Sequence, residues 1–177
     1  TLDQVKNITA CSRDNFSQDS MAIQTINLFS TYRLIDSKLG EELSTELISE
    51  VHNELTKSIP HLKDIEGTYR KGGVKADEKW LTVEYNPPAS PLDINFLLKN
   101  LIEWLEKDLI GKNPLIKAFL LHLHLKKIQP YYNANGHTAR LMEAWYLKKH
   151  GFKILTYLLP LIYNINITEY YRTVSEL

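Results

Sequence analysis

This chain of 177 residues contains a single cysteine, Cys11. One cysteine excludes a disulfide within the chain and fits a reducing compartment, so we expect a cytoplasmic protein. No apolar run approaches the roughly 18 residues that a membrane-spanning helix requires, and no secretory signal is visible at the start. The 21 basic residues equal the 21 acidic ones, and a balanced charge gives no support to nucleic-acid binding. Neither a membrane nor a nucleic acid is therefore expected as a partner.

Glycine and proline are also scarce, at seven each, so long segments run without a strong helix breaker. Apolar residues make up 44% of the chain, enough for one domain with a substantial core. They recur every three to four positions, which indicates helices. The predicted helices cover residues 20–40, 43–59, 92–110, 114–125, 141–147, 152–163 and 164–177, with a break expected at Pro160. The pattern predicts an all-α fold, an irregular helical bundle.

Residues 67–91 differ from the rest of the chain. Strand-forming residues gather between Trp80 and Tyr85, and the Gly72-Gly73 and Pro87-Pro88 pairs bracket them. This composition predicts a small β-hairpin, whose free edge could pair with an extended segment of another protein. A surface hairpin without a partner is the alternative. Arg70, taken alone, would be a solvated or ion-paired surface residue.

The loop at residues 128–141 separates two apolar helical segments. Its Asn133-Ala134-Asn135-Gly136 stretch has little side-chain bulk and leaves backbone N–H groups available at the start of a helix. Such a helix start favours an anion, because the unpaired amides and the helix dipole both attract negative charge. The alternative is an ordinary polar connection with an Asn or Gly cap.

This loop resembles the signature of the Fic (filamentation induced by cyclic AMP) family, His-Pro-Phe-x-Asp/Glu-Gly-Asn-Gly-Arg-x-x-Arg. The signature residues retained are Pro130, Asn135, Gly136 and Arg140, and Tyr131 stands for the Phe. The departures are Gln129 for the His, Asn133 for the acidic residue, Ala134 for the first Gly and His137 for the first Arg. The resemblance extends over residues 43–177, with residues 1–42 as an N-terminal helical extension. It also covers Leu43, Ile48, Val51 and His52 in the predicted helix over residues 43–59.

The resemblance implies a Fic-type helical bundle that transfers AMP from ATP to a protein hydroxyl, with Mg²⁺ as cofactor. It places Gln129 at the general base and Asn133 at the metal, although an amide is a poorer ligand for a hard cation than a carboxylate. The implied nucleotide-binding residues are Ala134, Asn135, Gly136, His137 and Arg140. The implied target-binding flap comprises Tyr69, Arg70, Gly72, Gly73 and Val74, which would bind a protein target or partner.

Gln129 decides the functional prediction. An amide accepts no proton in the working pH range, and loss of a positioned general base typically costs about 10² to 10⁴ in rate. We therefore predict a Fic-fold protein with impaired or lost catalysis that keeps a nucleotide- or anion-binding loop. The alternatives are an active nucleotidyl- or phosphate-transferring enzyme with altered chemistry, and a non-catalytic interaction module that binds neither ATP nor Mg²⁺.

Two further features of the sequence bear on this prediction. Ser20 and Gln24 lie at the spacing of a family inhibitory helix, with Gln in place of its Glu. The histidines that could replace the base, His122, His124 and His137, are interpreted as structural, and His52 as a half-buried helix residue.

Overall fold

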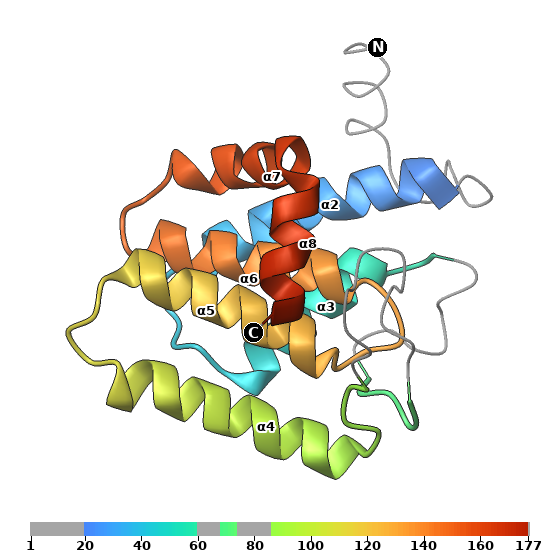
Figure 1. The fold of residues 1–177 in the computed structure, drawn as a ribbon. Coiled ribbons are helices and arrows are strands. Elements are labelled where there is room, and N and C mark those ends of the chain that lie inside the picture. Colours follow the sequence, from blue (N-terminus) through green and yellow to red (C-terminus); the bar gives the residue numbers. More distant parts are fainter. Residues whose placement is uncertain (1–19, 60–67, 74–85, 177) are drawn as a thin grey trace.

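The computed structural model of the chain describes residues 20–59, 68–73 and 86–176. The described residues form α-helices, and α4 continues directly into a π-helical turn, η3 (Figure 1). The elements are α2 (Ser20–Ser37), α3 (Thr45–Thr56), α4 (Pro91–Glu103), η3 (Trp104–Asp108), α5 (Pro114–Ile128), α6 (Asn135–Lys149), α7 (Leu155–Ile165) and α8 (Ile167–Glu176). The prediction of an all-α bundle is confirmed for this part of the chain.

Local capping explains where several helices begin. Ser44 accepts a hydrogen bond from the Leu47 backbone N–H at the start of α3, at 3.1 Å. Ser90 and Asn113 cap α4 and α5 in the same manner, and each is followed by a proline. Proline suits this first helical position, because its missing N–H would have no partner inside the helix.

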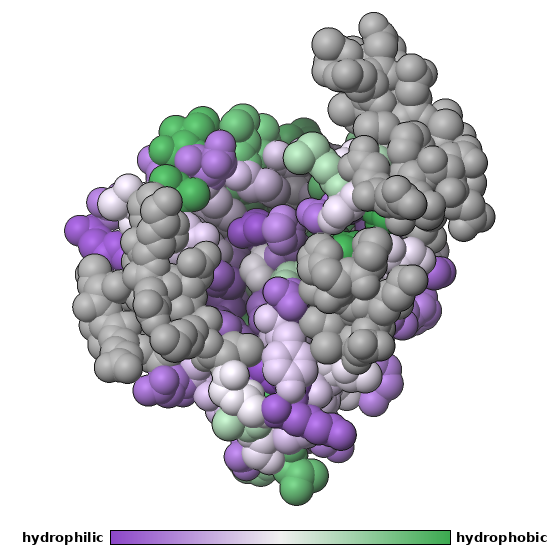
Figure 2. Space-filling model, turned by 90° about the vertical axis from the view of Figure 1, so that its right-hand side faces the viewer, coloured by the Kyte–Doolittle hydropathy of each residue, from purple (hydrophilic) through white to green (hydrophobic). Residues whose placement is uncertain are grey.

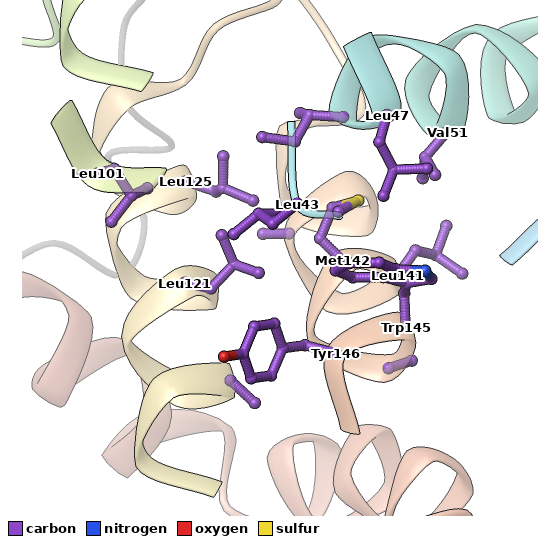
Figure 3. Packing of buried hydrophobic residues seen from close by; sticks show 14 of the residues in the cluster. Leu43, Leu47, Val51, Leu101, Leu121, Leu125, Leu141, Met142, Trp145 and Tyr146 are labelled. Atoms are coloured by element: carbon purple, nitrogen blue, oxygen red, sulfur yellow. The ribbon is translucent and has the colours of Figure 1, made fainter. Parts of the chain in front are cut away.

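The centre of the bundle is the pair α5 and α6, which lie side by side, with α3, α4 and the later helices around them (Figure 1). α6 is the most deeply buried element, and its Met142, Trp145 and Tyr146 face the leucines of α3 and α5 (Figure 3). Trp145 also donates its indole N–H to the Lys38 carbonyl, 2.9 Å away. The loop between α5 and α6 is thus anchored at both ends in the core.

The predicted β-hairpin is wrong for the described residues, since neither 68–73 nor 86–90 forms a strand. The middle of that prediction, 74–85, lies outside the described residues. The physical reason is that the backbone of residues 70–72 forms hydrogen bonds with the loop after α5 and with Ala89, and so does not pair as a strand. The Arg70 N–H donates to the Pro130 carbonyl at 3.0 Å, and both backbone groups of Lys71 bond to the Tyr132 hydroxyl. The Gly72 N–H donates to the Ala89 carbonyl at 2.8 Å.

α7 runs through Pro160 without a break, contrary to the expectation from the sequence. A proline inside a helix removes one N–H, here the donor for the Thr156 carbonyl, while the residues on either side keep their helical geometry. Apolar side chains of α7 remain exposed, among them Leu158, Leu161 and Ile165, and Figure 2 shows hydrophobic residues gathered at the top of the molecule. Within the described residues, no helix has both the length and the apolar character to cross a membrane.

Candidate functional site

Two left-handed residues shape the loop that carries the candidate site. Gln129 ends α5 with φ 45° and ψ 65°, and Ala134 precedes α6 with φ 59° and ψ 11°. Side chains are disfavoured in this region of backbone space, because Cβ approaches the next carbonyl. Ala134 also has no side-chain oxygen with which to cap α6. The first backbone N–H groups of α6 therefore have no side-chain acceptor at the N-cap position.

Asn135 closes this loop with a reciprocal pair of hydrogen bonds. Its Oδ1 accepts from the Tyr131 N–H at 2.9 Å, and its Nδ2 donates to the Tyr131 carbonyl at 2.7 Å. Both side-chain groups of Asn135 are committed to the loop. Only the backbone N–H of Asn135 therefore remains for the nucleotide-binding role predicted for this residue.

His52 in α3 packs against the loop between α5 and α6. It is fully buried, and its ring stacks on Tyr131 with centroids 3.6 Å apart. The Nε2 atom donates to the Asn133 carbonyl at 3.2 Å, which fixes the proton on that nitrogen because a carbonyl only accepts. Burial lowers the pKa of His52 to about 4, and the bond to Asn133 opposes this effect. His52 is therefore a neutral structural residue, as interpreted, though more deeply buried than expected.

Arg70 is a buried cap of α5, and the expectation of a surface position is wrong. It is fully buried, and its guanidinium donates to the carbonyls of Gln129 at 2.6 Å, Gly72 at 2.5 Å and Ile128 at 3.2 Å. The last carbonyls of a helix have no partner within the helix, and a positive charge also suits its negative end. Arg70 thus holds the backbone of Gln129 in place.

The other residues predicted for a target-binding flap lie beside the loop. Tyr69 is half-buried and packs against Tyr131 at a centroid distance of 5.9 Å. Gly72 adopts a positive φ of 122°, and Gly73 is exposed. Val74 lies outside the described residues. This predicted binding role stays a prediction.

A cavity of about 390 Å³ opens beside the N-terminus of α6. Ala134 and His137 line it on the α6 side. The remaining lining comes from the end of α3 and from α2, through Met21, Gln24, Thr25, Leu28, Leu55, Thr56 and Ile59. Gln24 donates to the Ser20 hydroxyl at 3.0 Å. The two residues of the predicted inhibitory helix therefore lie together, and one of them faces the candidate site.

The charge around the start of α6 suits an anion. No acidic residue occupies its first turn, and Arg140 lies one turn further along. The pKa of His137 is lowered, first by desolvation and then by the positive charges of Arg140 and Lys126. His137 is therefore mostly neutral at pH 7, so Arg140 contributes more positive charge to this end of the helix.

The loop is a poor match for Mg²⁺. Asn133 brings an amide in place of a carboxylate, and its backbone carbonyl already accepts from His52. Among the residues that the structure describes, no three His, Cys, Asp or Glu side chains come together as metal ligands. We therefore assign no chemical step to a metal at this position.

Residues 42–147 match the sequence model of the Fic/DOC family. The chain belongs to the Fic/DOC family. The predicted family membership is thereby confirmed, and the match covers the loop at residues 128–141, all of α5 and α6 as far as Leu147.

Similar proteins support this membership. A uridine 5'-monophosphate transferase from Xanthomonas campestris pv. campestris (strain 8004) is 33% identical over 92 residues, which are 49% of this chain and 17% of that protein. The structure of a Fic family protein from Desulfovibrio desulfuricans G20 has a TM-score of 0.79 at 22% identity, over 99% of this chain and 51% of that one. Fic-1 (residues 134–508) from C. elegans has a TM-score of 0.62 at 20% identity, over 90% of this chain and 49% of that one.

These coverages limit what the comparisons convey. The chain spans about half of each of the two solved chains and a smaller part of the Xanthomonas protein. At 20–22% identity, the solved structures show the Fic fold alone.

Proposed function

We propose that this Fic-family chain binds the phosphate groups of a nucleotide at the N-terminus of α6, and that nucleotidyl transfer to a protein hydroxyl is slow or absent. The observation that carries the binding part is the open start of α6, next to a cavity of about 390 Å³. Its N-cap residue Ala134 offers no side-chain acceptor, its first turn has no acidic side chain, and Arg140 follows one turn later. Backbone amides of this kind are suited to phosphate oxygens.

The proposed transfer requires a base that accepts one proton from the target hydroxyl. The hydroxyl oxygen of the target would form a bond to the α-phosphorus, the bond to the pyrophosphate group would break, and the hydroxyl proton would pass to a base. Gln129 stands at the position that the family signature gives to histidine, and an amide accepts no proton there. It can still orient a hydroxyl by hydrogen bonding.

The other histidines in this region do not offer an obvious substitute. His52 is enclosed by Tyr131 and the Asn133 carbonyl. His122 is fully buried and bonds through both ring nitrogens, to Glu143 and to the Tyr170 hydroxyl. His137 borders the cavity, but it belongs to the first turn of α6, eight residues beyond Gln129. These positions support the proposal that Gln129 limits the rate.

Restoring the base tests the proposal. We expect Gln129→His to increase the labelling of protein targets by at least about 100-fold over the wild type, the lower end of what a positioned base contributes. Histidine is among the side chains that tolerate the left-handed backbone found at this position. The measurement is transfer from labelled ATP and, because one relative is a uridine monophosphate transferase, from labelled UTP.

Two controls complete this experiment. Gln129→Ala should stay at the low rate of the wild type or fall below it, and Arg140→Ala combined with Gln129→His should abolish the gain. Strong labelling by the wild type that persists in Gln129→Ala would favour an active enzyme with altered chemistry. Calorimetry that detects no nucleotide binding at millimolar concentration would instead favour an interaction module without a ligand.

A further inference from the structure

α7 carries apolar side chains on the side that faces away from the bundle. Tyr157, Leu161 and Ile165 are 62%, 54% and 70% exposed, and Leu158 and Ile162 beside them are exposed as well. These positions recur every three to four residues, which is the spacing of a helix face that packs against another helix. Figure 1 places α7 at the top of the molecule, where Figure 2 shows hydrophobic residues on the surface.

Charged residues are missing from this part of the chain. None occurs between Ile154 and Thr168. The next helix, α8, shows the usual composition of a helix in contact with water, since its Glu169 and Arg172 form an exposed ion pair at 2.6 Å. The outer side of α7 therefore lacks the mixed charges that keep most solvent-facing surfaces from associating.

The apolar surface continues from α7 onto α2. The ring of Tyr32 stacks on Tyr157 with centroids 6.1 Å apart. Phe29, one turn before Tyr32, is 42% exposed. By their exposed fractions, the side chains of this surface cover on the order of 700 Å², more than the roughly 300–600 Å² of the largest apolar patch on a typical monomer. That area is close to the roughly 800 Å² that each partner contributes to a stable dimer.

We propose that the α7 face, made of Phe29 and the exposed apolar residues of α7, is the interface of a homodimer. A second copy of the chain brings the same uncharged stripe, so association desolvates no charge of α7 and brings no like charges together. In a twofold dimer both copies use the same surface. The two α7 helices cross near Leu158 and Leu161, in the middle of the stripe, and each covers the apolar side chains of the other.

This interface is separate from the nucleotide site. Among the described residues, those that line the cavity beside α6 include none from α7. The inference therefore does not depend on the proposed function, and its test requires no nucleotide.

Analytical ultracentrifugation of the full chain, from about 1 to 100 μM, measures the oligomeric state. We expect a monomer–dimer equilibrium with a micromolar Kd, because an interface of this size lies at the small end of the stable class. Leu161→Glu should weaken dimerisation at least about 100-fold, since the new charge would meet its own copy near the twofold axis. Ile116→Glu is the matched control: Ile116 of α5 is 53% exposed, so the same charge at equal exposure should leave the dimer intact.

Pairing opposite charges tests the twofold arrangement. Leu161→Lys alone should also be monomeric, but an equimolar mixture of Leu161→Glu and Leu161→Lys should form a heterodimer, because opposite charges then meet across the axis. Circular dichroism checks the fold of each variant. Ile165→Glu, at the end of the stripe, replaces any Leu161 variant that unfolds, and it should be monomeric as well.

Three results would overturn the homodimer. The first is a wild type that stays monomeric over the whole range, including one that binds vesicles of phosphatidylcholine and phosphatidylglycerol, because a membrane surface would then cover α7. The second is a dimer that survives Leu161→Glu or is lost equally in Ile116→Glu, because another surface would then join the copies. The third is a mixture of the two Leu161 variants that stays monomeric, because the two α7 helices would then not meet at Leu161.

Discussion

Gln129 and Ala134 occupy left-handed backbone positions that most side chains avoid. Both lie in the loop that opens toward the cavity, and surrounding residues impose their conformations. Arg70 bonds to the Gln129 carbonyl, and Asn135 fixes the loop just before Ala134. Backbone strain persists only where the neighbouring structure over-determines it, and it gathers at functional sites. The strained pair therefore agrees with a loop whose shape is retained for binding.

The strain at Ala134 gives a stability prediction. We expect Ala134→Gly to raise the free energy of unfolding by about 0.5–1 kcal/mol, because glycine removes the Cβ clash and this gain exceeds the added entropy of the unfolded chain. Ala139→Gly, the same change inside α6, should lower it by about 1 kcal/mol or more. Urea denaturation of the two variants measures both effects. Similar losses in both would show that Ala134 is not strained.

The helices were largely predictable from the sequence, whereas the supports of the loop were not. Apolar spacing is a local signal, and α3 and α5 begin within two residues of the predicted starts at 43 and 114. Arg70 instead binds carbonyls almost 60 residues away. Every residue has a carbonyl, so no sequence pattern marks these partners. The hairpin prediction failed for a related reason, because Tyr132 and Pro130 compete for the backbone bonds that a strand would need.

His52 joins α3 to the loop, and this contact should make stability depend on pH. The pKa of His52 is about 4 in the folded chain, against an ordinary value of 6.5. Above about pH 6.5 the ring is neutral in both states, and its stabilising contribution is complete. As the pH falls from about 6.5 to about 4, the unfolded chain takes up a proton that the folded chain resists. Stability should therefore fall by roughly 3 kcal/mol from this residue alone.

His52→Gln separates this effect from the titration of carboxylates. The glutamine amide can still donate to the Asn133 carbonyl, but it does not titrate. Unfolding free energies of both proteins, measured from pH 7 to pH 4, should show a wild-type advantage that shrinks as the pH falls. Parallel curves would mean that His52 does not titrate in this window.

Four helices meet at a buried polar junction that joins the end of the described chain to the centre of the bundle. Glu143 of α6 accepts from the Tyr163 hydroxyl of α7 at 2.7 Å and bonds to His122 Nδ1 of α5, also at 2.7 Å. His122 Nε2 bonds to the Tyr170 hydroxyl of α8 at 2.9 Å. Burial raises the pKa of Tyr170 to about 12, so its hydroxyl stays protonated. α7 adds little burial of its own, with Thr156 as its buried residue. The junction is therefore a main attachment of α7 and α8.

Removing Glu143 should loosen that end of the molecule first. Glu143→Ala leaves the Tyr163 hydroxyl and His122 Nδ1 without their acceptor and opens a small cavity, so we expect a loss of about 3 kcal/mol in unfolding free energy. Glu143→Gln keeps the shape and one acceptor oxygen and should lose about half as much. Glu169→Ala, an exposed partner of Arg172, should change stability by less than about 0.5 kcal/mol. Hydrogen exchange by mass spectrometry should show faster exchange in α7 and α8 than in α3 for Glu143→Ala. A uniform increase across all helices would instead mean that the junction stabilises the bundle as a whole and does not specifically hold its last two helices.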